Sequence, residues 1–491
     1  MGSSGPSRKV GGMDSLEGIS AEILCSCHKR RSPDRHICMG PWEGHSASAG
    51  TRGRWPALEA LQILKIELPA STTRASPVGS PGTQTAPSCL LSMESPHFAA
   101  ALSTRHDSQL AAREASRALM ESLAGSTPDL LVVFVSGEHR AEFDSLAARL
   151  GELCRARVLV GCCTQGLVAE GREIENAPAL ALWAVSSEEL EMTPFRLEAH
   201  RRSESEIEYT GLPNLSERDP ESDSLLVLGD PYSFPMADFL VGLEHHAPGM
   251  RVVGGMTSCD SPADPGVLFL GGSRVDGGAV GVLLSGGISL TSILSQAYRP
   301  VGDPWVVTDC KHGAIKHLGG KPATEAMMKT LQGLSTPDRL LLQNGPILGA
   351  AWDASKAAFK SSDFLAHPIR GVAPEEDAIV IVGRVRRGQT VQFMVRDAKT
   401  AGEDLVQQLA EKAGPAPEQA HAAGVLLFTC NGRGSHMFAE PNHDVRRIQA
   451  QLGEKLPIAG FFAMGEIGRV GGQNHLHGFT ASVAVYRAAQ D

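Results

Sequence analysis

Two glycine-rich stretches near the C-terminus hold the charged residues best suited to bind a ligand. The segment Cys430–Gly434 directly follows one apolar run, and a second apolar run leads through Gly460 to Glu466. Glycines let backbone N–H groups converge on a ligand, and the Arg433 guanidinium can hold a carboxylate or phosphate by two hydrogen bonds. Glu466 can pair with an amine. The two side chains therefore predict either a structural ion pair or a grip on the two charges of a zwitterion.

The glycine pattern of the second stretch occurs twice more. Residues 157–166 repeat a strand-like run with glycines at 161 and 166, and residues 251–259 are a looser copy. A buried strand that ends in glycines can bring its backbone close to a small molecule. We therefore expect loops that are distant along the chain to meet around one cavity, walled by two phenylalanines. The predicted ligand-binding residues are Cys162, Thr164, Cys430, Asn431, Arg433, Phe461, Phe462, Glu466, Asn474 and His477.

Two other groups of residues offer different chemistry. His475 and His477 lie at i and i+2 in a strand-like segment, so they could ligate a metal or haem together, or form hydrogen bonds in a turn. Cys430 with His443 and Asp444 supplies the residue types of a thiol nucleophile and its base. The sequence contains no zinc-protease helix, nucleophile elbow, kinase motif set or phosphate-binding loop. It therefore favours ligand binding without catalysis. We expect no metal and no cofactor, and the alternative is a bound haem.

The size and charge of the chain narrow the class of protein. With 491 residues, 42% hydrophobic and 20% charged, it has a globular composition and room for about two to three domains. The net charge of −10 argues against a general nucleic-acid binder. No apolar run approaches the roughly 18 residues that span a bilayer, and the N-terminus lacks a secretory apolar core. We expect a cytoplasmic protein whose cysteines are thiols.

Three units of similar order must position these residues. Each consists of a strand, a helix and two or more further strands, within residues 130–185, 224–284 and 424–486. This recurrence, at roughly 60 residues a unit, predicts an α/β protein with internally repeated mixed sheets that form two domains. Between the second and third units, residues 378–382 and 390–395 predict a hairpin.

The N-terminal segment differs from the rest. Residues 1–92 are rich in Ser, Gly, Pro and Arg, so we expect a disordered segment of low complexity, with the natural start hypothesised at Met93. Its cysteines and histidines lack the paired spacing of a zinc site. The predicted division is thus 1–92 disordered, 93–297 one α/β domain and 298–491 another.

The third unit resembles the C-terminal half of the FIST sensory-domain family, and the first two units resemble its N-terminal half. The resembling segments are 130–136, 161–166, 228–231, 430–434, 460–468 and 474–480. The resemblance covers about residues 95–490. It implies a two-part, non-catalytic input domain for small ligands, with amino acids the proposed class. Family members are fused to signalling outputs or to adaptors of ubiquitin ligases, and some are associated with haem-based sensing of nitric oxide.

The sequence and the resemblance together predict a cytoplasmic sensory protein that binds a small polar, amino-acid-like metabolite for signal transduction. No output domain is recognisable after Tyr486, so a separate signalling output protein is the expected partner. No nucleic-acid or membrane partner is expected. The alternatives are a haem-binding nitric oxide sensor and an interaction module like a ubiquitin-ligase adaptor.

Overall fold

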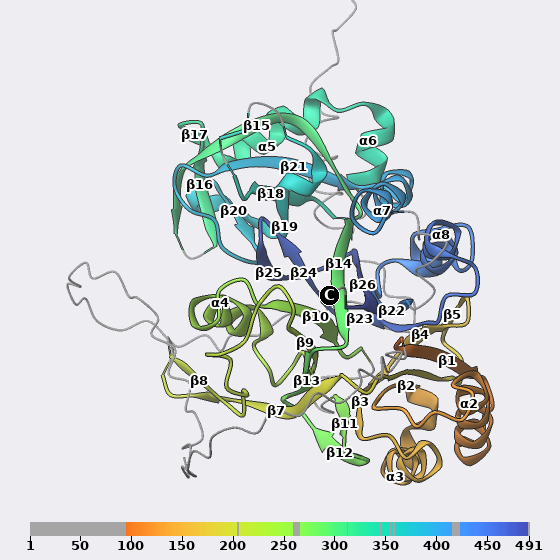
Figure 1. Ribbon diagram of the computed structural model, residues 1–491. Coiled ribbons are helices and arrows are strands. Elements are labelled where there is room, and N and C mark those ends of the chain that lie inside the picture. The colour runs from red at the N-terminus through yellow and green to blue at the C-terminus, as the bar shows by residue number, and fades with distance from the viewer. Residues whose placement is uncertain are drawn as a thin grey trace, which may run out of the picture. The chain divides into compact units, whose positions relative to one another are not determined.

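The computed structural model describes residues 95–203, 206–258, 266–311, 313–342, 345–353, 355–356, 359–414 and 423–489. The predicted disordered segment 1–92, including its cysteines and histidines, lies outside these residues. The prediction of an α/β protein with mixed sheets in two parts is confirmed (Figure 1). One compact unit contains residues 95–299, Ala351–Ala366 and residues 397–489. The other contains Pro300–Ala350 and His367–Arg396.

The larger unit is built from three repeats of one element order. In each, a strand, a helix and a parallel strand are followed by a hairpin and a closing strand. The first repeat contains β2 (Leu130–Ser136), α3 (Phe143–Cys154), β3 (Val158–Thr164), β4 (Gly166–Ala169), β5 (Arg172–Glu175) and β6 (Leu180–Ser186). The second contains β9 (Ser224–Gly229), α4 (Met236–His246), β10 (Arg251–Met256), β11 (Val267–Leu270), β12 (Ser273–Asp276) and β13 (Ala279–Ser285). The third contains β22 (Ala423–Cys430), α8 (His443–Leu452), β23 (Ile458–Ala463), β24 (Glu466–Val470), β25 (Gln473–His477) and β26 (Thr480–Ala488).

The hairpin of each repeat pairs with the sheet of a different repeat. The β4–β5 hairpin of the first repeat adds to β23 of the third, and the β24–β25 hairpin of the third adds to β10 of the second. The β11–β12 hairpin of the second repeat adds to β3 of the first. Because the three exchanges form a closed cycle, every repeat completes another repeat's sheet. This cycle brings residues of the first and third repeats together.

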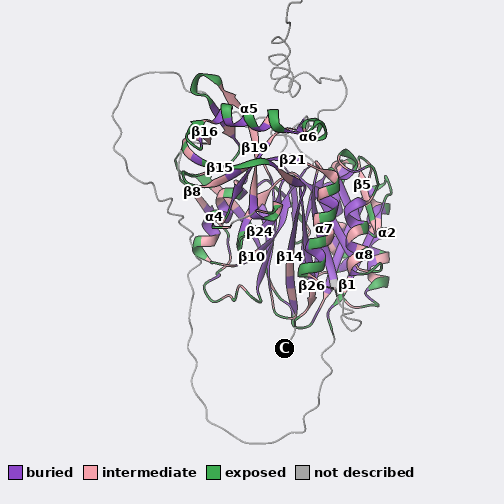
Figure 2. Cartoon of the chain, turned by 90° about the horizontal axis from the view of Figure 1, so that it is seen from above, coloured by how far each residue is buried: buried purple, intermediate pink, exposed green. Residues whose placement is uncertain are grey.

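A leading strand precedes each repeat and pairs with its closing strand. These leading strands are β1 (His97–Ser103), β7 (Glu191–Arg201) and β14 (Ile288–Gln296), and β8 (Ile207–Thr210) extends the second sheet beyond β7. One apolar cluster joins the inner faces of all three sheets. Helices cover the outer faces: α2 (Ser108–Ser122) with α3, α4 alone, and α7 (Ala398–Lys412) with α8. Figure 2 shows the strands largely buried, while α2, α7 and α8 carry exposed residues on their outer sides.

The smaller unit has its own sheet and apolar core. Its strands are β15 (Tyr298–Lys311), β16 (Ala314–Leu318), β17 (Lys321–Pro322), β18 (Ile347–Ala351), β19 (Phe364–Ala373), β20 (Ala378–Ile381) and β21 (Thr390–Arg396). Its helices are α5 (Ala323–Gly333) and α6 (Thr336–Leu341), and short 3₁₀ turns in the chain lie at Gly137–Glu142, Ser361–Asp363, Pro374–Glu376 and Gly434–His436. The predicted hairpin is wrong: β20 pairs with β19 and β16, whereas β21 pairs with β18. Adjacency in sequence suggested the hairpin, but two other strands lie between β20 and β21 in the sheet.

The repeated glycine has a structural role in each of the three units. Gly161, Gly254 and Gly460 lie at the same position of β3, β10 and β23, each opposite a residue of the parallel neighbouring strand. A Cβ atom at these positions would lie 2.2, 1.8 and 1.8 Å from the neighbouring carbonyl oxygen. No side chain fits at that distance. These glycines therefore permit close approach of two strands, whereas the sequence had suggested close approach of a ligand.

The state of four cysteines and the length of the helices bear on two expectations from the composition. Cys154, Cys162 and Cys430 are free thiols as expected, but Cys163 is disulfide-bonded, which corrects the expectation that it is a thiol. Among the described residues, no helix is both long and apolar enough to cross a membrane.

Candidate functional site

Loops from all three repeats converge where β3, β10, β22 and β23 end. The Asn431 backbone N–H donates to the Ala463 carbonyl at 2.9 Å, and its side-chain amide donates to Gln165 Oε1 at 3.3 Å. The Gln165 N–H in turn donates to Ser258 Oγ at 2.9 Å. The structure thus brings together the 430–434, 460–468 and 161–166 loops. β22 and β23 are parallel neighbours in one sheet, so their carboxyl ends lie side by side, whereas β3 and β10 belong to the two other sheets of this unit.

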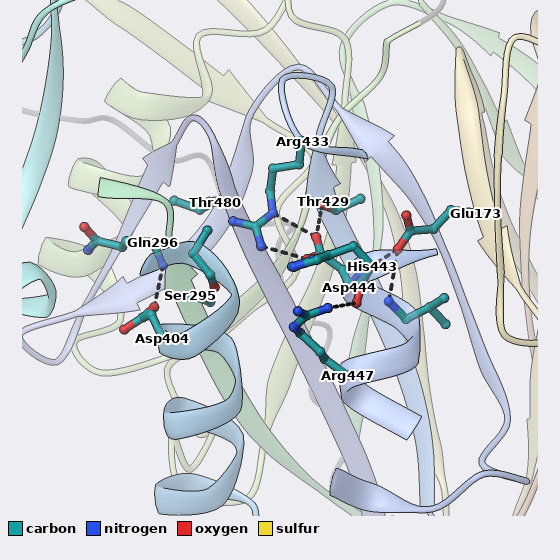
Figure 3. A network of polar contacts seen from close by, with 12 residues as sticks. Glu173, Ser295, Gln296, Asp404, Thr429, Arg433, His443, Asp444, Arg447 and Thr480 are labelled. Atoms are coloured by element: carbon teal, nitrogen blue, oxygen red, sulfur yellow. Dashed lines mark hydrogen bonds and ion pairs between the residues drawn. The ribbon is translucent and has the colours of Figure 1, made fainter. Parts of the chain in front are cut away.

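Arg433 is a fully buried charged residue of these loops. Its side chain is 0% exposed and makes a bidentate ion pair with Asp444: Nε lies 2.8 Å from Oδ2 and Nη2 lies 2.7 Å from Oδ1 (Figure 3). The Phe438 ring packs against the guanidinium, 5.1 Å from Cζ. The sequence suggested an ion pair between Arg433 and Glu466, but the ion-pair partner of Arg433 is Asp444. Among the described residues, Nη1 of Arg433 has no hydrogen-bond partner.

Asp444 gathers several donors at the start of α8. Its carboxylate accepts hydrogen bonds from Thr429 Oγ1 at 2.8 Å and lies 2.8 Å from His443 Nδ1. Burial alone would raise the pKa of Asp444, but the charge and hydrogen bonds of Arg433, with His443, hold that pKa well below its ordinary range. Asp444 is therefore a carboxylate that fixes the guanidinium of Arg433 in one orientation.

Glu173, which sequence analysis missed, caps the N-terminus of α8 from the first repeat. Its Oε1 accepts the backbone N–H groups of Asp444 at 2.9 Å and Val445 at 3.0 Å. A carboxylate is favoured there because the first N–H groups of a helix have no internal partner. Burial, and then the charge of Asp444, raise the pKa of Glu173 to about 7. No local sequence signal could identify this contact, because hairpin exchange brings β5 to α8 from 271 residues away.

Glu466 lies at the start of β24 with its side chain 0% exposed. Its Oε2 accepts the backbone N–H of Thr480 at 3.1 Å and the Thr480 hydroxyl at 2.8 Å. Oε1 has no partner among the described residues. Burial raises the pKa of Glu466 to about 8, although hydrogen bonding with Thr480 and with the Cys430 thiol, and the charge of Arg433, act in the opposite direction. The carboxyl group is therefore mostly neutral at pH 7.

A third unsatisfied polar atom lies beside Thr480, on the neighbouring strand. Gln296 is the Cα partner of Thr480 in the β14–β26 ladder, and its side chain is 3% exposed. Its Nε2 donates to the Phe364 carbonyl at 3.1 Å, which leaves Oε1 as an acceptor without a partner. In Figure 3 the Arg433 guanidinium lies between Asp444 on one side and Thr480 and Ser295 on the other. The charge of Arg433 also acts on Asp404, which accepts the Gln296 N–H at 2.8 Å.

Phe479 adopts a strained backbone conformation at this place. Its φ of +59° lies in the left-handed region, which bulky residues rarely adopt, and its half-buried ring packs on Gly432. A Cβ atom on Gly432 would lie 2.3 Å from the Phe479 ring. Backbone strain of this kind costs about 1–3 kcal/mol and concentrates at functional sites. Asn431, Gly432 and Phe479 are partly exposed and adjoin the buried Arg433 and Thr480 in sequence.

Other predicted residues of the first and third repeats lie mainly in packed cores. Cys162 and Phe461 belong to the inner cluster, where the Phe461 ring lies 5.2 Å from that of Phe134. Phe462 belongs to the outer core and contacts the 430–434 loop, because a Cβ on Gly434 would lie 2.7 Å from its ring. The buried Thr164 hydroxyl donates to the Gly166 carbonyl at 2.9 Å. Of this group, Phe462 alone has a contact with the Arg433 loop among the contacts described.

Asn474 and His477 make backbone contacts instead. Asn474 brackets β10, accepting from the Val252 N–H at 3.1 Å and donating to the Met250 carbonyl at 2.7 Å. His477 is the Cα partner of Glu466, and its Nε2 lies 3.1 Å from the Gly468 carbonyl. Burial lowers the pKa of the neighbouring His475. These contacts match the hydrogen-bonding alternative for the histidine pair, and haem ligation gains no support from this geometry.

The Cys430 thiol is poorly suited to nucleophilic chemistry. Burial and the nearby Glu466 raise its pKa far above the ordinary value, so the reactive thiolate is not populated at neutral pH. Among the described residues, neither His443 nor Asp444 hydrogen-bonds to Cys430; His443 instead stacks on Phe438 with ring centroids 3.3 Å apart. No group of three or more His, Cys, Asp or Glu residues in the described part of the chain could hold a metal ion.

Two protein-family models match consecutive ranges of this chain. The family model described as the FIST N domain matches residues 129–321, and that of the FIST C domain matches residues 323–469. An uncharacterized protein of Mycobacterium tuberculosis strain H37Rv, Rv0628c, is 39% identical over 386 residues, which cover 78% of this chain and 98% of that protein. An uncharacterized protein of Mycobacterium bovis, Mb0898c, is 36% identical over 384 residues, covering 78% of this chain and 97% of its own length. The chain therefore belongs to the FIST family, whose domains are sensory domains of signal transduction.

Proposed function

We propose that this protein senses a small polar, amino-acid-like metabolite at the junction of the 161–166, 430–434 and 460–468 loops, with the acidic group of the metabolite bound to Arg433. The observation that carries the proposal is a pair of buried polar atoms that lack partners among the described residues, Arg433 Nη1 and Glu466 Oε1, on groups whose charges act on each other's pKa. A buried polar group without a partner costs about 1–3 kcal/mol. A ligand that supplied the missing hydrogen bonds would recover that cost.

The chemistry of these atoms favours an amino-acid-like ligand. Arg433 is held by two of its nitrogens against Asp444, so the third can donate to a carboxylate without reorganisation of the guanidinium. Gln296 Oε1 is a further buried acceptor of the kind that suits an amine, although its amide points away from Arg433 in Figure 3. The ligand would enter by displacing the partly exposed cover formed by Asn431, Gly432 and Phe479, and the strained Phe479 backbone makes that cover a suitable moving part.

The same environment supports binding without catalysis. The thiol at the site, Cys430, is protonated, and burial raises the pKa of the neighbouring Glu466 carboxyl group to about 8, so that group is a poor base at neutral pH. A sensory protein that performs no chemistry must report occupancy to another molecule. We therefore include a separate signalling output protein, and action in the cytoplasm, in the proposal.

A thermal-shift screen of amino acids, other small metabolites and haem would test the function. The variant Arg433→Lys keeps the positive charge beside Asp444 but removes the free Nη1 donor. Arg447→Lys is the matched control, because Arg447 lies in the same network and binds the His443 carbonyl at 3.3 Å. We expect a ligand that raises the melting temperature of the wild type and of Arg447→Lys but not of Arg433→Lys. Equal stabilisation of all three proteins would show that the ligand binds elsewhere.

A further inference from the structure

We propose that Glu466 holds a proton in the unliganded protein and donates it as a hydrogen bond to the carboxylate of the ligand, beside Arg433. This inference rests on the proposed function and assigns a specificity-determining residue to the same site. It differs from the role suggested by sequence, in which Glu466 is ionised and binds an amine. The two roles predict opposite responses to pH and to one conservative substitution.

The surroundings of Glu466 favour the protonated form. Its carboxyl group is fully buried, and no Lys, Arg or His nitrogen in the described part of the chain lies within ion-pair distance of it. An isolated buried carboxylate is so costly that such groups take up a proton instead. The raised pKa, about 8, agrees with this geometric argument.

The hydrogen bonds of Glu466 decide which oxygen carries the proton. Oε2 accepts two hydrogen bonds from Thr480, and an oxygen that accepts in this way is the carbonyl-like one. The proton therefore resides on Oε1, which has no partner among the described residues. Oε1–H and Arg433 Nη1–H are two unused donors in one buried region, and each group's charge acts on the pKa of the other. Two donors, one of them cationic, match a carboxylate.

Several titratable groups face Glu466 from the surrounding elements. Cys430 of β22 lies against the carboxyl group, and its thiol stays protonated. His477 of β25 is the Cα partner of Glu466, with its Nε2 near the Gly468 carbonyl. Arg433 approaches from the 430–434 loop, with Asp444 of α8 and Asp404 of α7 beyond it. β10 and β26 contribute the uncharged Gly255 and Thr480. Glu466, whose pKa burial raises to about 8, is the group expected to titrate at the site between about pH 7.5 and about pH 9.

The assignment defines what the site requires of a ligand. A carboxylate is necessary, because Arg433 Nη1 and Glu466 Oε1 would both donate to it, whereas the assignment does not require an amine. Propionate, which retains the carboxylate of alanine, should therefore bind at this site. Ethylamine, which retains the amine alone, should not.

Isothermal titration of the full chain with propionate, and separately with ethylamine, would test this from about pH 7.5 to about pH 9. Propionate and Arg433 keep their charges throughout, so loss of the Glu466 proton should weaken wild-type binding, approaching tenfold per pH unit above about pH 8. Glu466→Gln, whose amide can both accept from Thr480 and donate to the ligand, should bind propionate within a few-fold of the wild type and without that pH dependence. Glu454→Gln, at an exposed position, is the matched control and should behave as the wild type.

Three results would overturn the inference. They are stronger binding as the pH rises, loss of propionate binding in Glu466→Gln, and binding of ethylamine but not propionate at millimolar concentration. Failure of the proposed function itself has a different signature. In that case, every metabolite that raises the melting temperature of the wild type would raise that of Arg433→Lys equally.

Discussion

At the residue scale, the ion pair between Arg433 and Asp444 is the centre of the buried hydrogen-bond network that includes Thr429 and His443. Removing two charges from water is costly, and the cost is offset here by two short hydrogen bonds and by the further donors that Thr429 and His443 provide to Asp444. The pair thus holds a cation at a fixed place inside the protein. Its presence does not by itself imply a gain in stability over an apolar pair.

A double-mutant cycle would measure the coupling of these two residues. Arg433→Met or Asp444→Leu leaves the other charge buried and unpaired, so each should lower the free energy of unfolding by about 3–5 kcal/mol. The double variant should cost clearly less than the sum, as chemical denaturation would show. The exposed pair Arg117–Glu121, with nitrogen and oxygen 3.8 Å apart, should give a coupling below about 1 kcal/mol in the same experiment. Additive costs at Arg433 and Asp444 would contradict the buried pairing.

Glu466 should make the stability of the protein depend on pH. Its pKa is raised from 4.5 to about 8 on folding, so between these values the unfolded chain loses the proton while the folded protein keeps it. Stability therefore falls as the pH rises through this window, by up to about 1.4 kcal/mol per unit, and levels off above about pH 8. Glu466→Gln removes this contribution, so its stability advantage over the wild type should grow from about pH 5 to about pH 8.

Denaturation curves of both proteins across this range would check the prediction. Glu173, with its pKa raised to about 7, contributes in the same direction to both proteins and cancels in the difference. A difference that does not change with pH would mean that Glu466 is ionised in the folded protein.

At the scale of elements, close contact between parallel strands explains the recurring glycine. In each repeat the second strand passes so near the first that a Cβ would meet a carbonyl oxygen. We expect Gly161→Ala, Gly254→Ala and Gly460→Ala each to cost at least about 3 kcal/mol, the upper range for overpacking, because backbone rather than a flexible side chain would have to move. Gly254 adds conformational strain, since its φ is +137°.

A glycine in a helix of the same unit provides the control. Gly151 lies in α3 with nothing within 4 Å of an added Cβ, so Gly151→Ala should be neutral or stabilising by up to about 1 kcal/mol. Thermal unfolding of the four variants would compare them. Alanine tolerated at all three strand positions would contradict the close approach of these strands.

At the scale of the whole molecule, cyclic hairpin exchange makes the three repeats depend on one another. In an open repeat array each unit contacts its neighbours, and terminal units can be removed. Here, removing the third repeat would leave β4, β10 and β14 without their partners β23, β24 and β26. Exposed strand edges of this kind promote aggregation.

Dividing the chain between residues 414 and 423 would test this dependence. We expect the repeats in fragments 1–414 and 423–491 to lack cooperative unfolding when each fragment is expressed alone, whereas the smaller unit, which lies within fragment 1–414 and has its own core, can still unfold by itself. Coexpressed, they should copurify and unfold cooperatively, because the strand pairings between them are regained. Circular dichroism during heating would decide. Protection of the β3 and β10 backbone amides from hydrogen exchange in fragment 1–414 alone, equal to that in the intact chain, would show that the first two repeats are self-sufficient.

The sequence by itself determined the three repeats, their strand–helix–strand order and the loops in which Arg433 and Glu466 lie. Local patterns carry this information, because apolar periodicity and glycine placement report which residues are buried and where strands end. Tertiary structure alone decided that Arg433 pairs with Asp444, that Glu173 caps α8, and that Glu466 is neutral. The Glu173 contact depends on hairpin exchange between segments 271 residues apart, whereas the Arg433–Asp444 pair and the state of Glu466 depend on exclusion of water from a closed interior. Neither leaves a local signal, since a residue type does not specify its distant neighbours or the dielectric around it.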